Sequence, residues 1–121
     1  MSKQENIEAI IIKWLNDIVP GYPASSDTPK ALPKRFILVE RTGGGREYLV
    51  GDDADILIEI YDKTSRFDCS EIANFIGDHI HELVEDYDDI TRATINSINS
   101  LDDTVKQYYR YQVYVDVFHR R

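Results

Sequence analysis

The chain has 121 residues, 42% of them hydrophobic, and a formal net charge of −8 at pH 7. The length is typical of one domain, and the hydrophobic fraction is too high for an intrinsically disordered protein. Because a general nucleic-acid binder needs a basic face that displaces counterions from phosphates, the acidic balance argues against that class. We therefore expect residues 1–121 to form a single soluble domain.

The N-terminal sequence lacks the basic region, the long apolar stretch and the cleavage site of a signal peptide. No apolar run approaches the roughly 18 residues of a membrane span. Cys69 is the only cysteine, which excludes an intrachain disulfide. These features predict assembly in a cytosol and no membrane partner.

Residues 3–19 are predicted to form the first helix. Ser2 and Glu5 have the spacing of a capping box, and Pro20 marks the end of the helix. Ile12 falls off the apolar stripe, so we expect it to be exposed. The residues that follow a 3.6-residue period and should face the core are Ile7, Ile10, Ile11, Trp14, Leu15 and Ile18.

Residues 20–34 contain all four prolines of the chain and are predicted to form an extended surface connector. We expect a strand at residues 35–41, and then a glycine-rich loop at residues 42–54. The next strand, residues 55–61, alternates between two faces. Its core face is predicted to consist of Ile56, Ile58 and Ile60.

Residues 66–84 are predicted to form a second helix, with Thr64 or Ser65 as its N-cap. An acidic run at residues 85–89 follows and ends this helix. The residues that should pack on the sheet form a stripe of helical spacing: Cys69, Ile72, Ala73, Ile76, Ile80, Leu83 and Val84.

Residues 90–98 form a weaker predicted strand, residues 100–103 a turn, and residues 106–118 a long last strand. The odd-numbered positions of the last strand are expected in the core. The even-numbered positions mix polar and aromatic side chains, which suits either a neighbouring subunit or solvent. The order α-β-β-α-β-β predicts an α+β fold, in which two helices pack on one face of a mainly antiparallel four-stranded sheet.

The glycines at residues 43–45 raise the question of a phosphate-binding loop. A P-loop requires Gly-Lys-Ser/Thr and a following helix, but Arg46 and a predicted strand follow here. The dinucleotide pattern G-x-G-x-x-G also fails, because Tyr48 stands at the position of its third glycine. We interpret the glycines as a flexible hairpin tip, flanked by Arg41 and Arg46.

No cluster of residues predicts catalysis or metal binding. His79 and His81 lie two positions apart on a helix and point to different sides, and His119 lies in a predicted solvated tail. The acidic segment 52–55 lacks the residue order of a calcium loop. Cys69 lies on an apolar stripe, where a buried and unreactive thiol is expected. We therefore predict a protein with no enzymatic activity and no cofactor.

Two short motifs make the chain similar to a known family. They are LPKRFILVERTGG at residues 32–44 and RYQVYVDVFHR at residues 110–120. With the element order, they resemble the tail terminator (tail completion) proteins of tailed bacteriophages and prophages. The positions that match the family pattern are Leu32, Pro33, Phe36, Val39, Arg41, Thr42, Gly43, Gly44, Arg110, Tyr111, Val113 and Val115.

The resemblance implies a structural virion protein, usually a hexameric ring, that caps the tail tube and ends its polymerisation. The implied partners are further copies of the chain, the tail tube protein and a head-completion or connector protein, and DNA passes through the pore without specific binding. The implied location is the virion tail. The predicted protein interface, at the hairpin tip and the last strand, consists of Arg41, Thr42, Gly43, Gly44, Gly45, Arg46, Tyr108, Arg110, Tyr114 and Phe118.

Two other functions stay open at the level of the sequence. The first is a different neck or head–tail connector protein of a phage. The second is a small ligand-binding or enzymatic α+β domain, which needs a concave site with convergent polar groups. The nearest candidates for such a site are Arg41, Arg46, Asp52 and Asp53.

Overall fold

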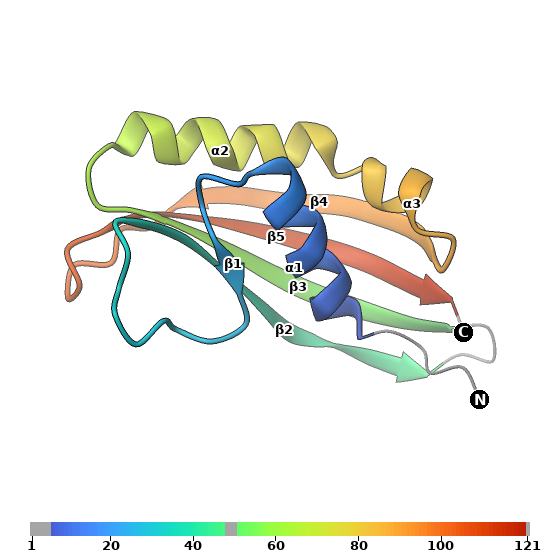
Figure 1. Cartoon of the computed structure of the whole chain (residues 1–121). Coiled ribbons are helices and arrows are strands. Elements are labelled where there is room, and N and C mark those ends of the chain that lie inside the picture. Colours follow the sequence, from blue (N-terminus) through green and yellow to red (C-terminus); the bar gives the residue numbers. More distant parts are fainter. Residues whose placement is uncertain (1–5, 48–50, 121) are drawn as a thin grey trace.

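The structure is a computed structural model that describes residues 6–47 and 51–120, without the side chains of residues 45–47 (Figure 1). The predicted capping box at Ser2 and Glu5 lies outside the described residues. The elements in chain order are α1 (Ile7–Ile18), β1 (Ala24–Ser25), β2 (Arg35–Glu47), β3 (Gly51–Asp62), α2 (Arg66–His79), α3 (Glu82–Asp86), β4 (Ile90–Ser100) and β5 (Tyr109–Arg120).

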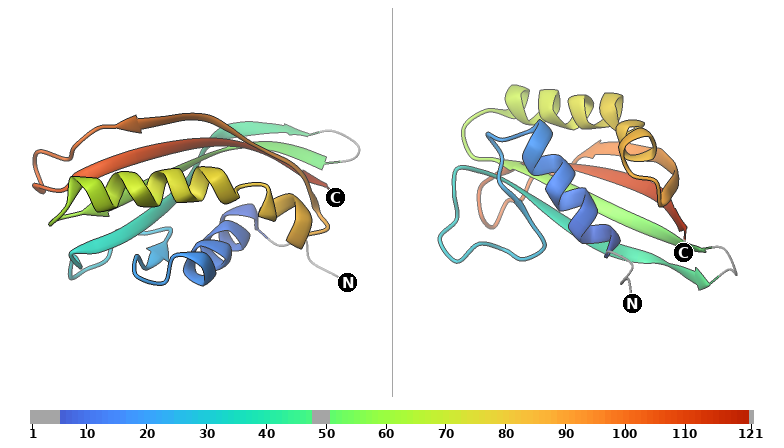
Figure 2. Two further views of the ribbon diagram at one scale, coloured as in Figure 1. Left: turned by 90° about the horizontal axis from the view of Figure 1, so that it is seen from above. Right: turned by 45° about the vertical axis from the view of Figure 1, so that its right-hand side comes forward.

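The five strands form one mixed sheet in the order β1-β2-β3-β5-β4. β1 runs parallel to β2, and the other neighbouring strands are antiparallel. All three helices lie over the same face of the sheet (Figure 2). The predicted α+β class is therefore confirmed, whereas the predicted count of four strands and two helices is wrong.

The additional strand, β1, lies inside the predicted connector at residues 20–34. Its Ala24 pairs with Ile37 of β2. The side chain of Asn16 in α1 accepts from the N–H of Ala24 at 2.9 Å and donates to its carbonyl at 3.2 Å. Tyr22 and Ala24 are buried, so the connector is not a surface segment throughout its length. A two-residue strand has no hydrophobic period that sequence reasoning detects.

The additional helix, α3, arises because the predicted helix at residues 66–84 breaks after His79. At the junction the backbone hydrogen bonds span three residues: Ile80 N–H donates to Gly77, and Leu83 N–H donates to Ile80. This turn redirects the chain and keeps Leu83 buried (Figure 1). Val84, which was predicted to face the sheet, is exposed as a consequence.

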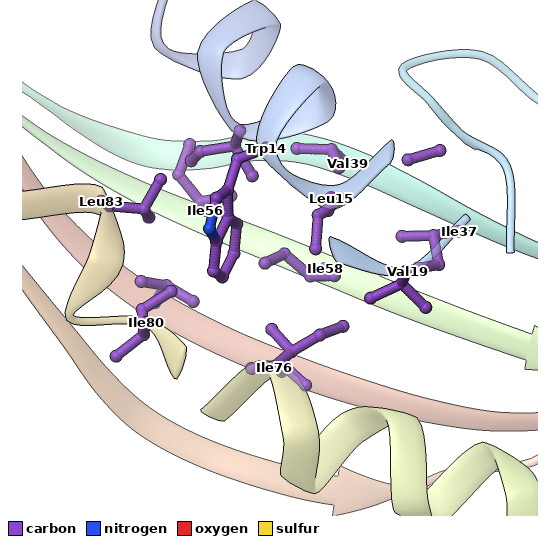
Figure 3. Packing of buried hydrophobic residues seen from close by; sticks show 14 of the residues in the cluster. Trp14, Leu15, Val19, Ile37, Val39, Ile56, Ile58, Ile76, Ile80 and Leu83 are labelled. Carbon is purple, nitrogen blue, oxygen red and sulfur yellow. The ribbon is translucent and has the colours of Figure 1, made fainter. Parts of the chain in front are cut away.

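The core lies between the helices and the sheet (Figure 3). Ile12, which was expected to be exposed, packs partly buried against this core. His119 is buried rather than part of a solvated tail, because β5 continues to Arg120. Ser65 caps α2 by accepting from the N–H of Asp68, which confirms one of the two predicted caps. The predicted core face of β3 is confirmed, with full burial of Ile56, Ile58 and Ile60.

Candidate protein-interaction surface

The sheet face opposite the helices has no helix over it (Figure 2). Because side chains alternate along a strand, the cross-strand register defines which residues share this face. We call it the open face. It consists of Phe36, Leu38, Glu40, Asp53, Asp55, Leu57, Glu59, Tyr61, Arg92, Thr94, Ser97, Asn99, Arg110, Gln112, Tyr114, Asp116 and Phe118.

Arg92 organises the end of the open face that lies near the β2–β3 hairpin. Its Nη2 lies 2.6 Å from Oδ1 of Asp53 and 3.0 Å from Oδ2 of Asp116. Its guanidinium carbon lies 5.7 Å from the centre of the Phe118 ring, which is the geometry of a cation–π contact. Phe118 therefore stands beside one positive and two negative charges, a group with a net charge of −1.

Arg110 organises the opposite end of the open face. Its Nε donates to the carbonyl of Leu101 at 2.8 Å, and its Nη1 lies 3.5 Å from Oε2 of Glu59 and 3.4 Å from the hydroxyl of Tyr61. Burial lowers the pKa of Arg110, but Tyr61 and the carboxylates of Glu59 and Asp103 raise it above its ordinary value. The guanidinium is thus largely buried and used within the chain.

Tyr108 belongs to a second small core at this same end, and not to an accessible interface. Its ring meets those of Phe36 and Tyr61 edge-on, and these two rings stack with centres 4.5 Å apart. The Tyr108 hydroxyl donates to the carbonyl of Pro33 at 2.7 Å. This contact fixes the C-terminal end of the proline-rich connector against the open face.

Tyr114 occupies the middle of the open face, opposite Leu57 of β3 in the cross-strand register. Tyr114 is half-buried, Leu57 is buried, and Leu38 of β2 is half-buried nearby in the sheet. An aromatic and aliphatic centre between two charged ends is the arrangement common in protein–protein interfaces, where an apolar centre has a polar rim.

The glycines do not form the predicted loop at residues 42–54, because β2 continues to Glu47 and β3 begins at Gly51. The three residues between these strands lie outside the described residues. Register shifts between Arg41 and Gly43 and between Gly44 and Glu47 show that β2 carries bulges here. Gly44 has a φ of +85°, a left-handed conformation that favours glycine.

Two predicted interface residues of the hairpin, Arg41 and Thr42, are exposed and hydrogen-bond to the backbone of β3. Arg41 donates from Nη2 to the carbonyl of Asp53 at 3.1 Å, and the Thr42 hydroxyl donates to the carbonyl of Asp55 at 3.4 Å. The backbone of Gly45 and Arg46 continues β2, and the Arg46 side chain lies outside the described part of the chain.

The structure separates the predicted interface residues into two regions. Phe118 pairs with Asp53 at the hairpin end of the sheet. Arg110 lies eight residues away along the same strand, which corresponds to about 26 Å at 3.3 Å per residue. The hairpin residues and Phe118 therefore form one region and Tyr108 with Arg110 the other, with Tyr114 between them.

A buried polar network near the connector had no counterpart in the sequence prediction. Asp62 is fully buried; its Oδ2 accepts from the Tyr22 hydroxyl at 2.5 Å and lies 3.2 Å from Nε of Arg35. Its Oδ1 accepts from Thr64 and from the backbone N–H of Ser65. Burial raises the pKa of Tyr22 above its ordinary value, so the hydroxyl stays a donor. The Asp-x-Thr-Ser spacing at residues 62–65 was the available sequence signal.

The burial of Asp62 by itself raises the pKa of its carboxyl group, but the hydrogen bonds from Tyr22 and from the Thr64 and Ser65 backbone outweigh this effect. The net result is a pKa below the ordinary value, which keeps the carboxylate ionised. The network joins the connector, β2, the end of β3 and the start of α2. These contacts fix the position of the connector relative to the sheet. Both oxygens of the Asp62 carboxylate have partners within the network.

The single cysteine is buried within the core. Burial raises the pKa of the Cys69 thiol to about 12, and its Sγ lies 3.2 Å from the carbonyl of Ile60. Residues 6–47 and 51–120 hold no group of three or more His, Cys, Asp or Glu side chains that fits a metal ion. A polar hollow of about 300 Å³ beside Lys63 and Tyr108 includes Asp102, whose carboxylate already binds Arg66 at 2.6 Å.

Comparison with models of known protein families gives no match to this chain, and no curated protein matches it. Within the described ranges, none of the helices has both the length and the apolar character to cross a membrane. The remaining indications of function are therefore the geometry of the open face and of the β2–β3 hairpin, together with the sequence resemblance.

Proposed function

We propose that this protein is a phage tail terminator, a structural virion component that forms a ring on the end of the tail tube. In this role it ends polymerisation of the tube and provides the surface that joins the tail to the head. The observation that supports the proposal most is the open face, a whole sheet surface without a helix over it, on which aromatic side chains and arginines gather.

The motifs of the resemblance add a second line of support. In the motif at residues 32–44, Phe36 and Val39 are core residues, whereas Arg41 to Gly44 form the bulged hairpin that ends one side of the sheet. The motif at residues 110–120 forms β5, which lies between β3 and β4. The first motif therefore forms most of the β2 side of the hairpin, and the second contributes the β5 residues of the open face.

A ring requires head-to-tail association, in which two different surfaces of each copy meet. The two edges of this sheet differ, because β1 and the connector lie along β2 while β4 forms the other edge. A chain with unlike edges suits a rotational assembly. The proposed role needs no catalytic group and no cofactor.

The alternative of a small ligand-binding domain gains no support from two of its four predicted site residues, Arg41 and Asp53. Arg41 donates to the backbone of Asp53, and the Asp53 carboxylate binds Arg92. These polar groups therefore pair with one another instead of converging on a cavity. We retain a different phage neck or head–tail connector protein as the second candidate, since an open sheet face serves either kind of assembly.

The experiment uses purified tail tubes incubated with the full chain and imaged by electron microscopy. We expect discrete rings at one tube end and an arrest of further growth when tube protein is added. Tyr114→Ala and Phe118→Ala should reduce the capped fraction, whereas the matched control Val84→Ala, an exposed apolar residue of α3 on the helix side of the sheet, should not. Uncapped tubes that keep growing would refute the proposal, and binding to the head connector alone would favour the second candidate.

A further inference from the structure

An apolar groove lies between the end of α1 and the middle of α2. It has a volume of about 270 Å³, and its walls include Ile18, Pro20, Ile72 and Phe75. The volume lies just below the range of roughly 300–1,000 Å³ that is usual for small-molecule sites. An opening of this size and character fits a single branched aliphatic side chain better than a drug-sized ligand.

The rim of the groove adds exposed aromatic surface. Phe75 remains 37% exposed beside the groove, and Phe67, two turns earlier on α2, is 69% exposed. Large aromatic side chains left in water on one helix mark an interaction site more often than isolated exposed aliphatic residues do. The groove therefore has a partly exposed aromatic wall, and Phe67 adds exposed apolar surface elsewhere on the same helix.

One wall of the groove belongs to a strongly acidic part of the chain. Residues 66–89 contain eight acidic residues and one arginine, a net charge of −7, so this part of the chain holds almost all of the net charge of −8. Asp17 and Glu71 directly precede the groove residues Ile18 and Ile72, and neither forms an ion pair with another described residue. An apolar groove with an acidic rim favours a segment that is both apolar and basic.

The chain itself contains such a segment. Residues 29–34, PKALPK, carry two lysines and no acidic residue, and we call them the connector arm. Leu32 at its centre is 41% exposed. Tyr108 holds the carbonyl of Pro33, and the N–H of Lys63 donates to the carbonyl of Lys34 at 2.8 Å. The arm is therefore held in place with its leucine outward, which lowers the entropy cost of binding.

The two lysines of the arm lie on either side of its leucine. Lys30 and Lys34 flank Leu32 at two residues on each side, and the chain bends at Lys30, Ala31 and Lys34. A leucine that enters the groove thus brings one lysine to each side of it, toward the acidic rim. Lys30 and Lys34 make no ion pair with any other described residue, so both remain available.

We propose that the connector arm of one copy of this chain docks into the α1–α2 groove of a second copy, with Leu32 in the groove and the two lysines on its acidic rim. In one copy the arm lies outside the β2 edge of the sheet, whereas α2 covers the opposite part of it (Figure 1). The contact is therefore head to tail: the copy that supplies the arm keeps a free groove, and the copy that supplies the groove keeps a free arm. The inference rests on the proposed ring function, because the two surfaces that it names are those by which neighbouring copies in the ring meet.

The test is a nuclear magnetic resonance titration of ¹⁵N-labelled full chain with unlabelled full chain up to about 1 mM, a range that detects a Kd of about 1 mM. We expect concentration-dependent amide shifts in two regions, residues 18–22 with 72–75 and residues 30–34, which fit one common Kd. Leu32→Ser and Phe75→Ala should each raise this Kd at least about tenfold. Shifts confined to the open face, or no shifts, would overturn the inference.

Matched controls and a mixing experiment separate docking from a general loss of stability. Leu101→Ser and Val105→Ala change exposed apolar residues elsewhere and should leave the Kd unchanged. A mixture of Leu32→Ser with Phe75→Ala retains one intact arm and one intact groove, so it should form dimers and nothing larger. Variants that associate as the wild type does, or a mixture that stays monomeric, would contradict head-to-tail docking.

The tube-capping experiment distinguishes this inference from the proposed function. Tubes that Leu32→Ser still caps as the wild type does would overturn the docking contact and leave the ring function standing. Tubes that stay uncapped while the wild-type chain shows the two-region titration would refute the terminator role and leave the docking contact standing.

Discussion

Removing the hydroxyl group of Tyr22 tests the buried carboxylate that ties the connector to the sheet. The substitution Tyr22→Phe keeps the ring, which is 3% exposed, and deletes only the donor that lies 2.5 Å from Oδ2 of Asp62. The packing of the ring is preserved, so the change in the free energy of unfolding reports the hydrogen bond and not a cavity.

The expected magnitude follows from the remaining contacts of Asp62. A hydrogen bond to a charged group contributes about 1.5–3 kcal/mol. After the substitution the carboxylate keeps Arg35 at 3.2 Å and donors from Thr64 and Ser65 at 2.9–3.0 Å, so it is not left without partners. We therefore expect the lower part of the range, a loss of about 1.5–2 kcal/mol in the free energy of unfolding.

The assay is urea unfolding followed by circular dichroism at pH 7. With a denaturant slope of about 2 kcal/mol per M, the midpoint should fall by about 1 M at an unchanged slope. Tyr111→Phe is the matched control, because Tyr111 packs partly buried against the core and its hydroxyl makes no hydrogen bond with another described residue. The control should change the free energy by less than about 0.5 kcal/mol.

The pH dependence provides a second measurement of the same bond. The pKa of Asp62 is lower in the folded protein than in the unfolded chain, where it is about 3.9. Its contribution is therefore complete above the unfolded pKa and is lost as the pH falls through the folded pKa. Because Tyr22→Phe raises the folded pKa, the stability difference from wild type should shrink in acid. A loss below about 0.5 kcal/mol at pH 7, or a difference that grows in acid, would refute the reasoning.

Two further predictions concern the hairpin and the thiol. Gly44→Ala should lower the free energy of unfolding by about 2–4 kcal/mol, because the φ of +85° is strained for alanine and its Cβ would lie 2.5 Å from the carbonyl of Asp53. Gly21→Ala, where a Cβ meets nothing within 4 Å, is the control and should stay within about 0.5 kcal/mol of wild type; equal urea midpoints for the two variants would contradict this. Burial raises the pKa of Cys69 to about 12, so alkylation by iodoacetamide at pH 8 should require unfolding, and fast labelling of the native chain would contradict the described burial.

Periodic patterns account for the parts of the fold that were predicted correctly. The helical stripe from Ile7 to Leu15 and the alternation at Ile56, Ile58 and Ile60 each repeat often enough to define one buried face. The α+β class follows from the order of these patterns. The N-cap at Ser65 was predictable from the residue type, and the buried thiol of Cys69 from its position on the helical stripe.

Short or interrupted patterns account for the errors. β1 has only two residues, and its position depends on the Asn16 side chain of a preceding helix. The apolar stripe of the second predicted helix continues across the break near Ile80, so the period did not reveal α3. The glycines of β2 suggested a loop because glycine disfavours strands, but the pairing with β3 continues through their bulges.

The sequence by itself determined the buried faces of α1 and β3, since burial there follows a local period, and the order of its elements indicated the α+β class. Only the tertiary structure decided which distant residues meet: Tyr22 with Asp62, Arg92 with both Asp53 and Asp116, and the two helices that enclose the apolar groove. The physical reason is that these contacts depend on the order of strands in the sheet and on the path of the connector. Both are set by the packing of the whole chain and leave no periodic trace in the residues that they bring together.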